Sequence, residues 1–191
     1  NADLDDDARV NGSRWRNQPA VALPLTATWG YFTPRMRLDQ TDYLLQDQLP
    51  GVDDHVSRTV PFYSVDSGLY LDRSTALFGR QYNQSLEPRM FYVYSKEAAQ
   101  DDIPNFDSSV ATFSYSQIYR DDRFVGGDRV GDNNRVTLGL TSRLNQLTDG
   151  SEVLRASVGR IFYFDEQNVS LKGQGVEDKD GSPLAGEVLW R

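Results

Sequence analysis

Two stretches of sequence decide the fold: SLEPRMFYVY at 85–94 and FSYSQIYRDDRFVGGDRVGDNNR at 113–135. In the first, Glu87 and Arg89 alternate with apolar side chains, the period-two pattern of a strand with one polar and one apolar face. The second begins with the same alternation, which predicts a strand over ATFSYSQIY at 111–119. It then enters a loop in which acids and bases interleave around glycines.

The same alternation extends in both directions from these stretches. It is clearest in RVTLGLTSRL at 135–144, where Leu138 and Leu140 face one way and polar residues face the other. Asp149-Gly150 predicts a tight turn, since Asp-Gly accepts positive φ. Another short turn is expected at Arg73-Ser74. The remaining strand-like stretches lie at 20–29, 31–45, 58–72, 77–94, 152–164 and 186–191, and the connections at 46–55, 96–109 and 165–185.

Composition narrows the classes of protein. The chain has 191 residues, 12% aromatic, with no Cys and a formal net charge of -8. The aromatic content favours strands, and the acidic balance argues against a nucleic-acid partner. No run reaches the roughly 18 apolar residues of a membrane helix, but a transmembrane barrel strand needs only about 9–11 residues with every second one apolar.

About eight long antiparallel strands and no helix predict an all-β fold. Strands beyond the usual ~5–6 residues favour part of a large transmembrane β-barrel wall over a compact sandwich. We expect residues 1–191 to be one partial barrel domain without an internal boundary. The strand at 186–191 should need a partner from sequence outside the segment.

The sequence contains no catalytic constellation. His55 is the only histidine, and no Ser/His/Asp or Cys/His arrangement can be built around it. The many carboxylates fall in loops, and the sequence does not place two of them across a cleft. We therefore expect no enzyme and no cofactor or metal site. Two alternatives stay open: a soluble β-sandwich binding module and a carbohydrate-active enzyme.

Two groups of polar residues are candidates for a functional role. The positive and negative charges of the loop at 120–134 nearly cancel. The loop either folds on itself through charge-assisted hydrogen bonds or docks on a polar partner. An Arg that faces lipid at mid-depth would cost about 2–4 kcal/mol, so Glu87 and Arg89 are expected to point into a wet lumen, and Arg135, Arg143 and Arg155 fit the same rule. The loop candidates are Arg120, Asp121, Arg123, Asp128, Arg129 and Asp132, and the lumen candidates are Glu87, Arg89, Arg135, Thr137, Thr141 and Arg143.

Several colinear motifs resemble one family. LEPRMFYVY, IPNFDSS, FSYSQIYRDDRFVGGDRVGDNNRVTLGLTSRL and ASVGRIFYF are similar to LptD, the lipopolysaccharide-assembly protein of the Gram-negative outer membrane. The earlier RNQPAVALPL, WGYFTPRMRL and VPFYSVDSGLYLDR follow the same family in order. The resemblance covers most of the chain, with little of it in residues 1–9 and 167–183.

The resemblance implies a location and a set of partners. The family forms a very large outer-membrane barrel that releases lipopolysaccharide into the outer leaflet, with a plug lipoprotein, LptE, in its lumen. This segment would be the middle of the barrel wall, among outer-membrane lipid. It would lack the periplasmic domain, the remaining barrel strands and the family's cysteines. By analogy, the 120–134 loop would fold inward toward the plug.

Overall fold

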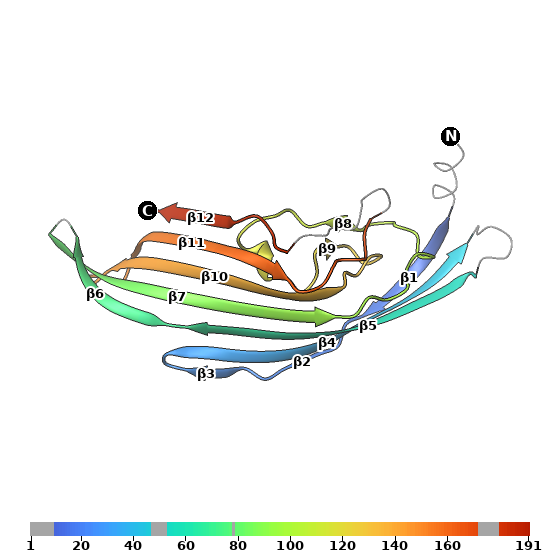
Figure 1. Cartoon of the computed structure of the whole chain (residues 1–191), viewed down its shortest axis with the longest axis horizontal. Coiled ribbons are helices and arrows are strands. Elements are labelled where there is room, and N and C mark those ends of the chain that lie inside the picture. Colours follow the sequence, from blue (N-terminus) through green and yellow to red (C-terminus); the bar gives the residue numbers. More distant parts are fainter. Residues whose placement is uncertain (1–9, 47–52, 78, 172–179) are drawn as a thin grey trace.

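A computed structural model describes residues 10–46, 53–77, 79–171 and 180–191, and one curved antiparallel sheet dominates it (Figure 1). The strands of this sheet are β1 (Asn11–Asn17), β2 (Ala20–Ala22), β3 (Leu25–Ala27), β4 (Gly30–Gln46), β5 (His55–Leu69), β6 (Leu71–Leu77), β7 (Arg80–Ser95), β10 (Asn133–Gln146), β11 (Glu152–Tyr163) and β12 (Ala185–Trp190). Neighbours follow the order β1-β4-β5-β7-β10-β11-β12, while β2 and β3 also pair with β4 and β6 pairs with β7.

Several of these strands are pieces of one longer strand. Between β1 and β3 the chain stays beside β4, but Pro19 and Pro24 cannot donate to the ladder and interrupt it. Backbone bonds continue across the breaks, from Leu38 N to Pro19 O at 2.9 Å and from Leu23 N to Pro34 O at 3.0 Å. The long antiparallel strands predicted from the sequence are therefore confirmed.

The sheet has two unlike faces because its residues alternate. On β10, the buried residues Arg135 and Thr137 donate hydrogen bonds to Arg120 O and Ile118 O. They therefore face the segment at 96–132, which lies on the concave side of the sheet (Figure 1), and we call this side the inner face. Leu138 and Leu140 are exposed on the convex side, the outer face. Residues 96–132, which connect β7 to β10, lie over the inner face (Figure 1). We call them the covering segment.

Short turns and long connections lie at opposite ends of the sheet (Figure 1). The hairpins β3–β4, β6–β7 and β10–β11 turn at one end. The connections β4–β5, β7–β10 and β11–β12 leave from the other end. Within the first and last of these connections, residues 47–52 and 172–179 lie outside the described part of the chain. The turn predicted at Asp149-Gly150 is confirmed, with a φ of 74° at Gly150.

The turn predicted at Arg73 and Ser74 is wrong. Both residues lie inside β6, opposite Gln84 and Asn83 of β7. Polar Arg73 and Ser74 do not stop a strand, and Arg73 bonds Gln84 across the pair at 2.7 and 2.9 Å. The hairpin instead turns at Gly79, whose φ of 76° is one that glycine adopts readily.

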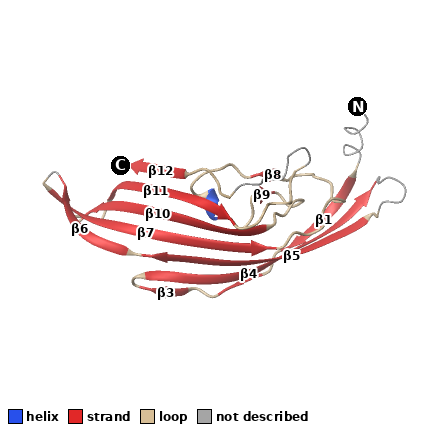
Figure 2. Cartoon of the chain, in the orientation of Figure 1, coloured by secondary structure: helices blue, strands red, loops and turns tan. Residues whose placement is uncertain are grey.

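The strand predicted over residues 111–119 is also wrong. These residues join no strand ladder, and Gln117–Tyr119 forms the 3-10 turn η1, blue in Figure 2. Tyr115 and Tyr119 are four residues apart and stack edge-to-face, with ring centroids 5.6 Å apart. Packing against the inner face therefore overrides the strand preference of this aromatic stretch. Two short strands of the covering segment, β8 (Ser109–Val110) and β9 (Phe124–Val125), pair with each other instead.

No helix in the described part of the chain is long and apolar enough to cross a membrane.

Candidate functional site

All six strand residues predicted to share a polar face lie on the inner face. Cross-strand partners share a face, and β10 aligns Thr141 with Glu87 and Gly139 with Arg89 of β7. The six are Glu87, Arg89, Arg135, Thr137, Thr141 and Arg143. Their alternation with apolar residues is what aligns them.

Three of the four charged members of this set, Glu87, Arg89 and Arg143, lie in ion pairs. Arg89 pairs with Asp66 of β5 at 2.6 Å, and its guanidinium lies 4.0 Å from the ring centroid of Tyr119. Arg143 joins Glu87 at 2.9 Å and Glu152 at 3.0 Å. These side chains are partly exposed, so each pair contributes little net stability and mainly keeps the face polar.

The covering segment buries the other part of the set. Thr137 donates to Ile118 O at 2.8 Å, and Arg135 donates to Arg120 O at 2.8 Å. The Nε of Arg135 is buried without a hydrogen-bond partner. A buried donor without a partner lowers the stability of the fold. The covering segment is therefore held on the sheet by contacts at other positions.

Asp128 of the covering segment makes the largest set of these contacts. Its side chain is fully buried. It accepts hydrogen bonds from Arg14 at 2.7 Å and from the Tyr43 hydroxyl at 3.0 Å. The backbone N–H groups of Phe106 and Asp107 donate to its other oxygen at 2.8 and 2.7 Å. One carboxylate thus joins β1, β4 and two parts of the covering segment.

Arg58 of β5 holds the backbone next to Asp128. It is buried and donates to Asp128 O at 2.6 Å, to Gly127 O at 2.9 Å and to Gln100 Oε1 at 2.9 Å. Gln100 in turn donates to Val130 O at 2.9 Å. The tip of the loop is therefore tied to the wall through main-chain atoms as well as through its charges.

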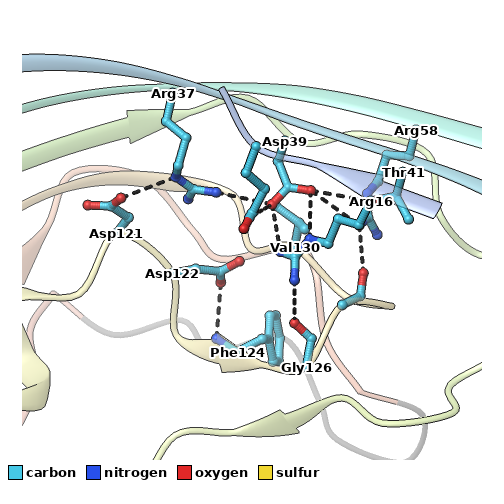
Figure 3. Close-up of polar contacts among 12 residues, drawn as sticks. Arg16, Arg37, Asp39, Thr41, Arg58, Asp121, Asp122, Phe124, Gly126 and Val130 are labelled. Carbon is cyan, nitrogen blue, oxygen red and sulfur yellow. Dashed lines mark hydrogen bonds and ion pairs between the residues drawn. The ribbon is translucent and has the colours of Figure 1, made fainter. Parts of the chain in front are cut away.

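A second buried carboxylate, Asp39 of β4, lies beside this contact (Figure 3). Arg16 binds both of its oxygens, at 2.6 and 3.3 Å, and Arg37 donates at 3.1 Å. Gln18 donates at 2.6 Å. Arg16 also reaches Gly126 O of the covering segment at 2.7 Å. Asp39 therefore orients an arginine that holds the loop.

The remaining loop candidates are also engaged with this chain. Asp121 pairs with Arg35 at 3.0 Å and with Arg37 at 3.3 Å. Asp132 accepts from the N–H groups of Asn168 and Val169 at 2.7 and 3.1 Å. The other contacts are from Arg123 to Asp132 at 3.4 Å and to Val169 O, from Arg129 to Ile103 O at 2.7 Å and from Arg120 to Asp122 O at 3.2 Å. Of the two behaviours left open, the segment thus folds onto its own chain.

The pKa values of two acids of the covering segment are shifted in opposite directions. The hydrogen bond from Arg14 lowers the pKa of Asp107, with further help from the Gly127 N–H. Burial raises the pKa of Asp122, although the N–H groups of Phe124 and Gly131 donate to its carboxylate. The two pKa shifts differ because the Arg14 guanidinium contacts Asp107 directly. Asp122 receives hydrogen bonds from backbone N–H groups instead.

Near its middle, around η1, the covering segment packs against two glycines of the sheet. Gly139 and Gly159 are cross-strand partners on β10 and β11. A Cβ at Gly139 would overlap the Tyr119 hydroxyl, and one at Gly159 would lie 2.7 Å from Ile118 Cδ1. Tyr119 donates to Tyr115, whose hydroxyl lies 3.0 Å from Thr141 Oγ1. The absence of two side chains thus makes the space in which η1 docks.

Comparison with known proteins gives the family. The family model described as "LptD: LPS transport system D" matches residues 1–191. The chain belongs to the LptD family. It is 62% identical over 191 residues to the LPS-assembly protein LptD of Hahella chejuensis, covering 100% of this chain and 24% of that protein. It is 47% identical to the LptD of Marinobacter nauticus, over 95% of this chain and 23% of that one.

The LptD match bears on the alternatives. The chain spans about a quarter of the length of the curated relatives it matches. The soluble sandwich is wrong as an architecture, because the described residues form one large sheet, and the second sheet pairs only the two-residue strands β8 and β9. The LptD relatives are named as assembly proteins, which leaves the carbohydrate-active enzyme without support.

The residues of the wall that hold this LptD loop were not singled out from the sequence. They are Arg14, Arg16, Arg37, Asp39, Tyr43 and Arg58. A signal was present on β4, since Arg35, Arg37 and Asp39 occupy every second position. Asp39 acts through Arg16, and the loop partners of the other five lie about 70–115 residues away along the chain. Period-two patterning carries no information about such pairs.

Proposed function

We propose that this segment forms part of the wall of an outer-membrane β-barrel that inserts lipopolysaccharide into the outer leaflet. The inner face would line the lumen and the outer face would meet the membrane. One observation carries this proposal: along β7 and β10, charged or buried residues alternate with exposed apolar ones such as Met90, Leu138 and Leu140. An outer face of this kind suits lipid, where an Arg at mid-depth would cost about 2–4 kcal/mol.

The same proposal assigns the two ends of the sheet. Outer-membrane barrels have short periplasmic turns and longer extracellular loops. The short hairpins of this chain share one end, and its long connections share the other. The covering segment would therefore start at the extracellular end and fold back into the lumen.

The partners follow from the family and from the sheet edges. Lipopolysaccharide, an LptE-like plug lipoprotein and outer-membrane lipid would be the partners of the assembled protein. Among the described residues, β12 and β1 each pair with one strand of the main path. Their other edges would pair with the remaining barrel strands, which would lie outside this segment together with a periplasmic domain.

The six loop candidates would divide between two roles at the plug. Arg120, Asp121, Arg123 and Arg129 keep partial exposure, so they are the better contacts for a plug lipoprotein. Asp128 and Asp132 are buried and bonded within the chain. Their part would be to hold the covering segment in the shape that the plug meets.

Cysteine labelling tests which face meets the membrane. In the full-length protein, Leu140→Cys should react with a membrane-soluble thiol reagent, and Thr141→Cys should not. The two residues are adjacent on β10 and differ mainly in face, so each is the control of the other. The reverse pattern would sink the proposal.

A second experiment tests the contact with the plug. The double variant Asp128→Ala with Arg129→Ala should lower the amount of plug lipoprotein that copurifies, or slow maturation of the barrel. The control is Asp101→Ala with Asp102→Ala, because both acids are exposed in the same segment. Unchanged assembly in the first variant would remove the covering segment from plug recognition.

A further inference from the structure

An arginine lies on the apolar outer face. Arg160 of β11 is exposed and is the cross-strand partner of Leu138. Its Nε donates to Ser182 O at 2.8 Å, and its guanidinium lies 5.3 Å from the ring centroid of Phe162. Both Nη atoms have no hydrogen-bond acceptor among the described residues. The guanidinium packs beside Gly181 and Phe162, and its two Nη atoms are left for a ligand beside apolar side chains.

Arg160 ends a cross-strand row that contains an apolar groove. The strand registers place six outer-face residues in this row: Leu25, Phe32, Ser67, Met90, Leu138 and Arg160. The first five line a groove of about 680 Å³ together with Trp29 and Leu69. Ser67 has the smallest side chain of those five residues, so the surface is recessed at the centre of the row.

The row crosses the sheet obliquely from one end to the other. Phe32 lies close to the short turn that precedes β4, whereas Arg160 lies three residues before Tyr163, where β11 ends beside a long connection. At about 4.8 Å per strand the row is roughly 24 Å long. In the orientation proposed above, Arg160 would be at the extracellular edge of the apolar band and the groove would descend from it.

We infer that this row binds a phosphate-bearing lipid of the surrounding membrane, with an acyl chain in the groove and the phosphate on the Nη atoms of Arg160. Charge and shape both select this occupant: a guanidinium binds phosphate through paired N–H groups, and an apolar groove accepts a hydrocarbon chain. The inference rests on the proposed function, because it requires the outer face to lie in the membrane.

Native mass spectrometry of the full-length protein with its plug lipoprotein tests the site. The complex is loaded in detergent with phosphatidylglycerol, and separately with diacylglycerol carrying the same chains. Arg160→Gln should lower phosphatidylglycerol binding by roughly fivefold, the usual effect of one basic residue at an anionic membrane surface. It should leave diacylglycerol binding unchanged.

The matched control is Arg73→Gln. Arg73 is an exposed arginine on β6, outside the groove, and bonds only Gln84 among the described residues. A second variant, Ser67→Phe, fills the groove and should lower binding of both lipids. Equal phosphatidylglycerol binding by Arg160→Gln and Arg73→Gln would overturn the inference and leave Arg160 reaching to water instead.

The two proposals fail in different ways. If Leu140→Cys is labelled from water, the outer face is not in the membrane and the proposed function fails. If Leu140→Cys is labelled from the membrane but Arg160→Gln binds phosphatidylglycerol as Arg73→Gln does, the lipid site alone fails.

Discussion

The covering segment meets the inner face at two unlike places. At the polar anchor, Asp128 receives four hydrogen bonds, two of them from Arg14 and Tyr43 on the wall. At the glycine seat, η1 fits over Gly139 and Gly159. The anchor is specific because both carboxylate oxygens of Asp128 accept hydrogen bonds from fixed donors. The seat is specific because no side chain fills the space.

This difference determines how each contact can be broken. A buried ion pair adds little over an apolar substitute, but removing one partner leaves a buried charge unpaired and is strongly destabilising. A steric seat responds in the opposite way, since added atoms force a shift while small deletions leave room. The anchor should therefore fail by deletion and the seat by addition.

The largest effect is expected from Asp128→Ala. It leaves the N–H groups of Phe106 and Asp107 without their acceptor, and it leaves Arg14 paired with Asp107 alone. Each buried donor that loses its acceptor costs about 1–3 kcal/mol, so the covering segment should leave the wall. Limited proteolysis of the full-length protein should then cleave between β7 and β10. Asp102→Ala, an exposed acid of the same segment, is the control, and equal cleavage of both variants would refute the anchor.

A smaller effect is expected from Gly139→Ala. The new Cβ would overlap the Tyr119 hydroxyl, and overpacking of this kind costs about 1–3 kcal/mol. Gly186→Ala on β12 is the matched control, since its Cβ would lie 3.4 Å from Ser157 O, an ordinary contact. Urea unfolding of the full-length protein measures the difference.

A compensating change separates the seat from a general strand effect. Tyr119→Leu removes the ring that the new Cβ would meet, so the double variant with Gly139→Ala should recover most of the stability lost by Gly139→Ala. If Gly139→Ala stays equally destabilising in the Tyr119→Leu background, the cost comes from the strand and not from η1.

The same contrast explains what the sequence could predict. Period-two alternation was enough for the strands and for the shared face of Glu87, Arg89 and Arg135, because it is a local property. It failed at 111–119, where Tyr115 and Tyr119 obtain their packing from Gly139 and Gly159 on other strands.

The polar anchor shows the same limit. The loop that holds Asp128 was recognised as a candidate from its charges and glycines. Its partners Arg14, Tyr43 and Arg58 lie on strands whose register with the loop is set by the whole sheet. A single sequence contains both residues of such a contact but does not indicate that they pair with each other.

The smallest effect concerns pH and two acids of the covering segment. The folded-state pKa of Asp107 lies below its unfolded value of about 3.9, so Asp107 stabilises the docked segment above that pH and loses this contribution as the pH falls through the lower value. Asp122 has the opposite sign. Its raised pKa gives a contribution that is present at low pH and lost as the pH rises through it.

Hydrogen exchange of the covering segment between pH 4 and pH 7 should separate these two signs. Asp107→Asn should be less protected than the natural protein throughout this range, because the Arg14 contact needs the carboxylate. Asp122→Asn keeps an oxygen for the Phe124 and Gly131 N–H groups and has no proton to lose. Its protection should match the natural protein near pH 4 and equal or exceed it at pH 7. A loss of protection in Asp122→Asn that grows toward pH 7 would mean that the Asp122 charge, and not its hydrogen bonds, holds this part of the segment.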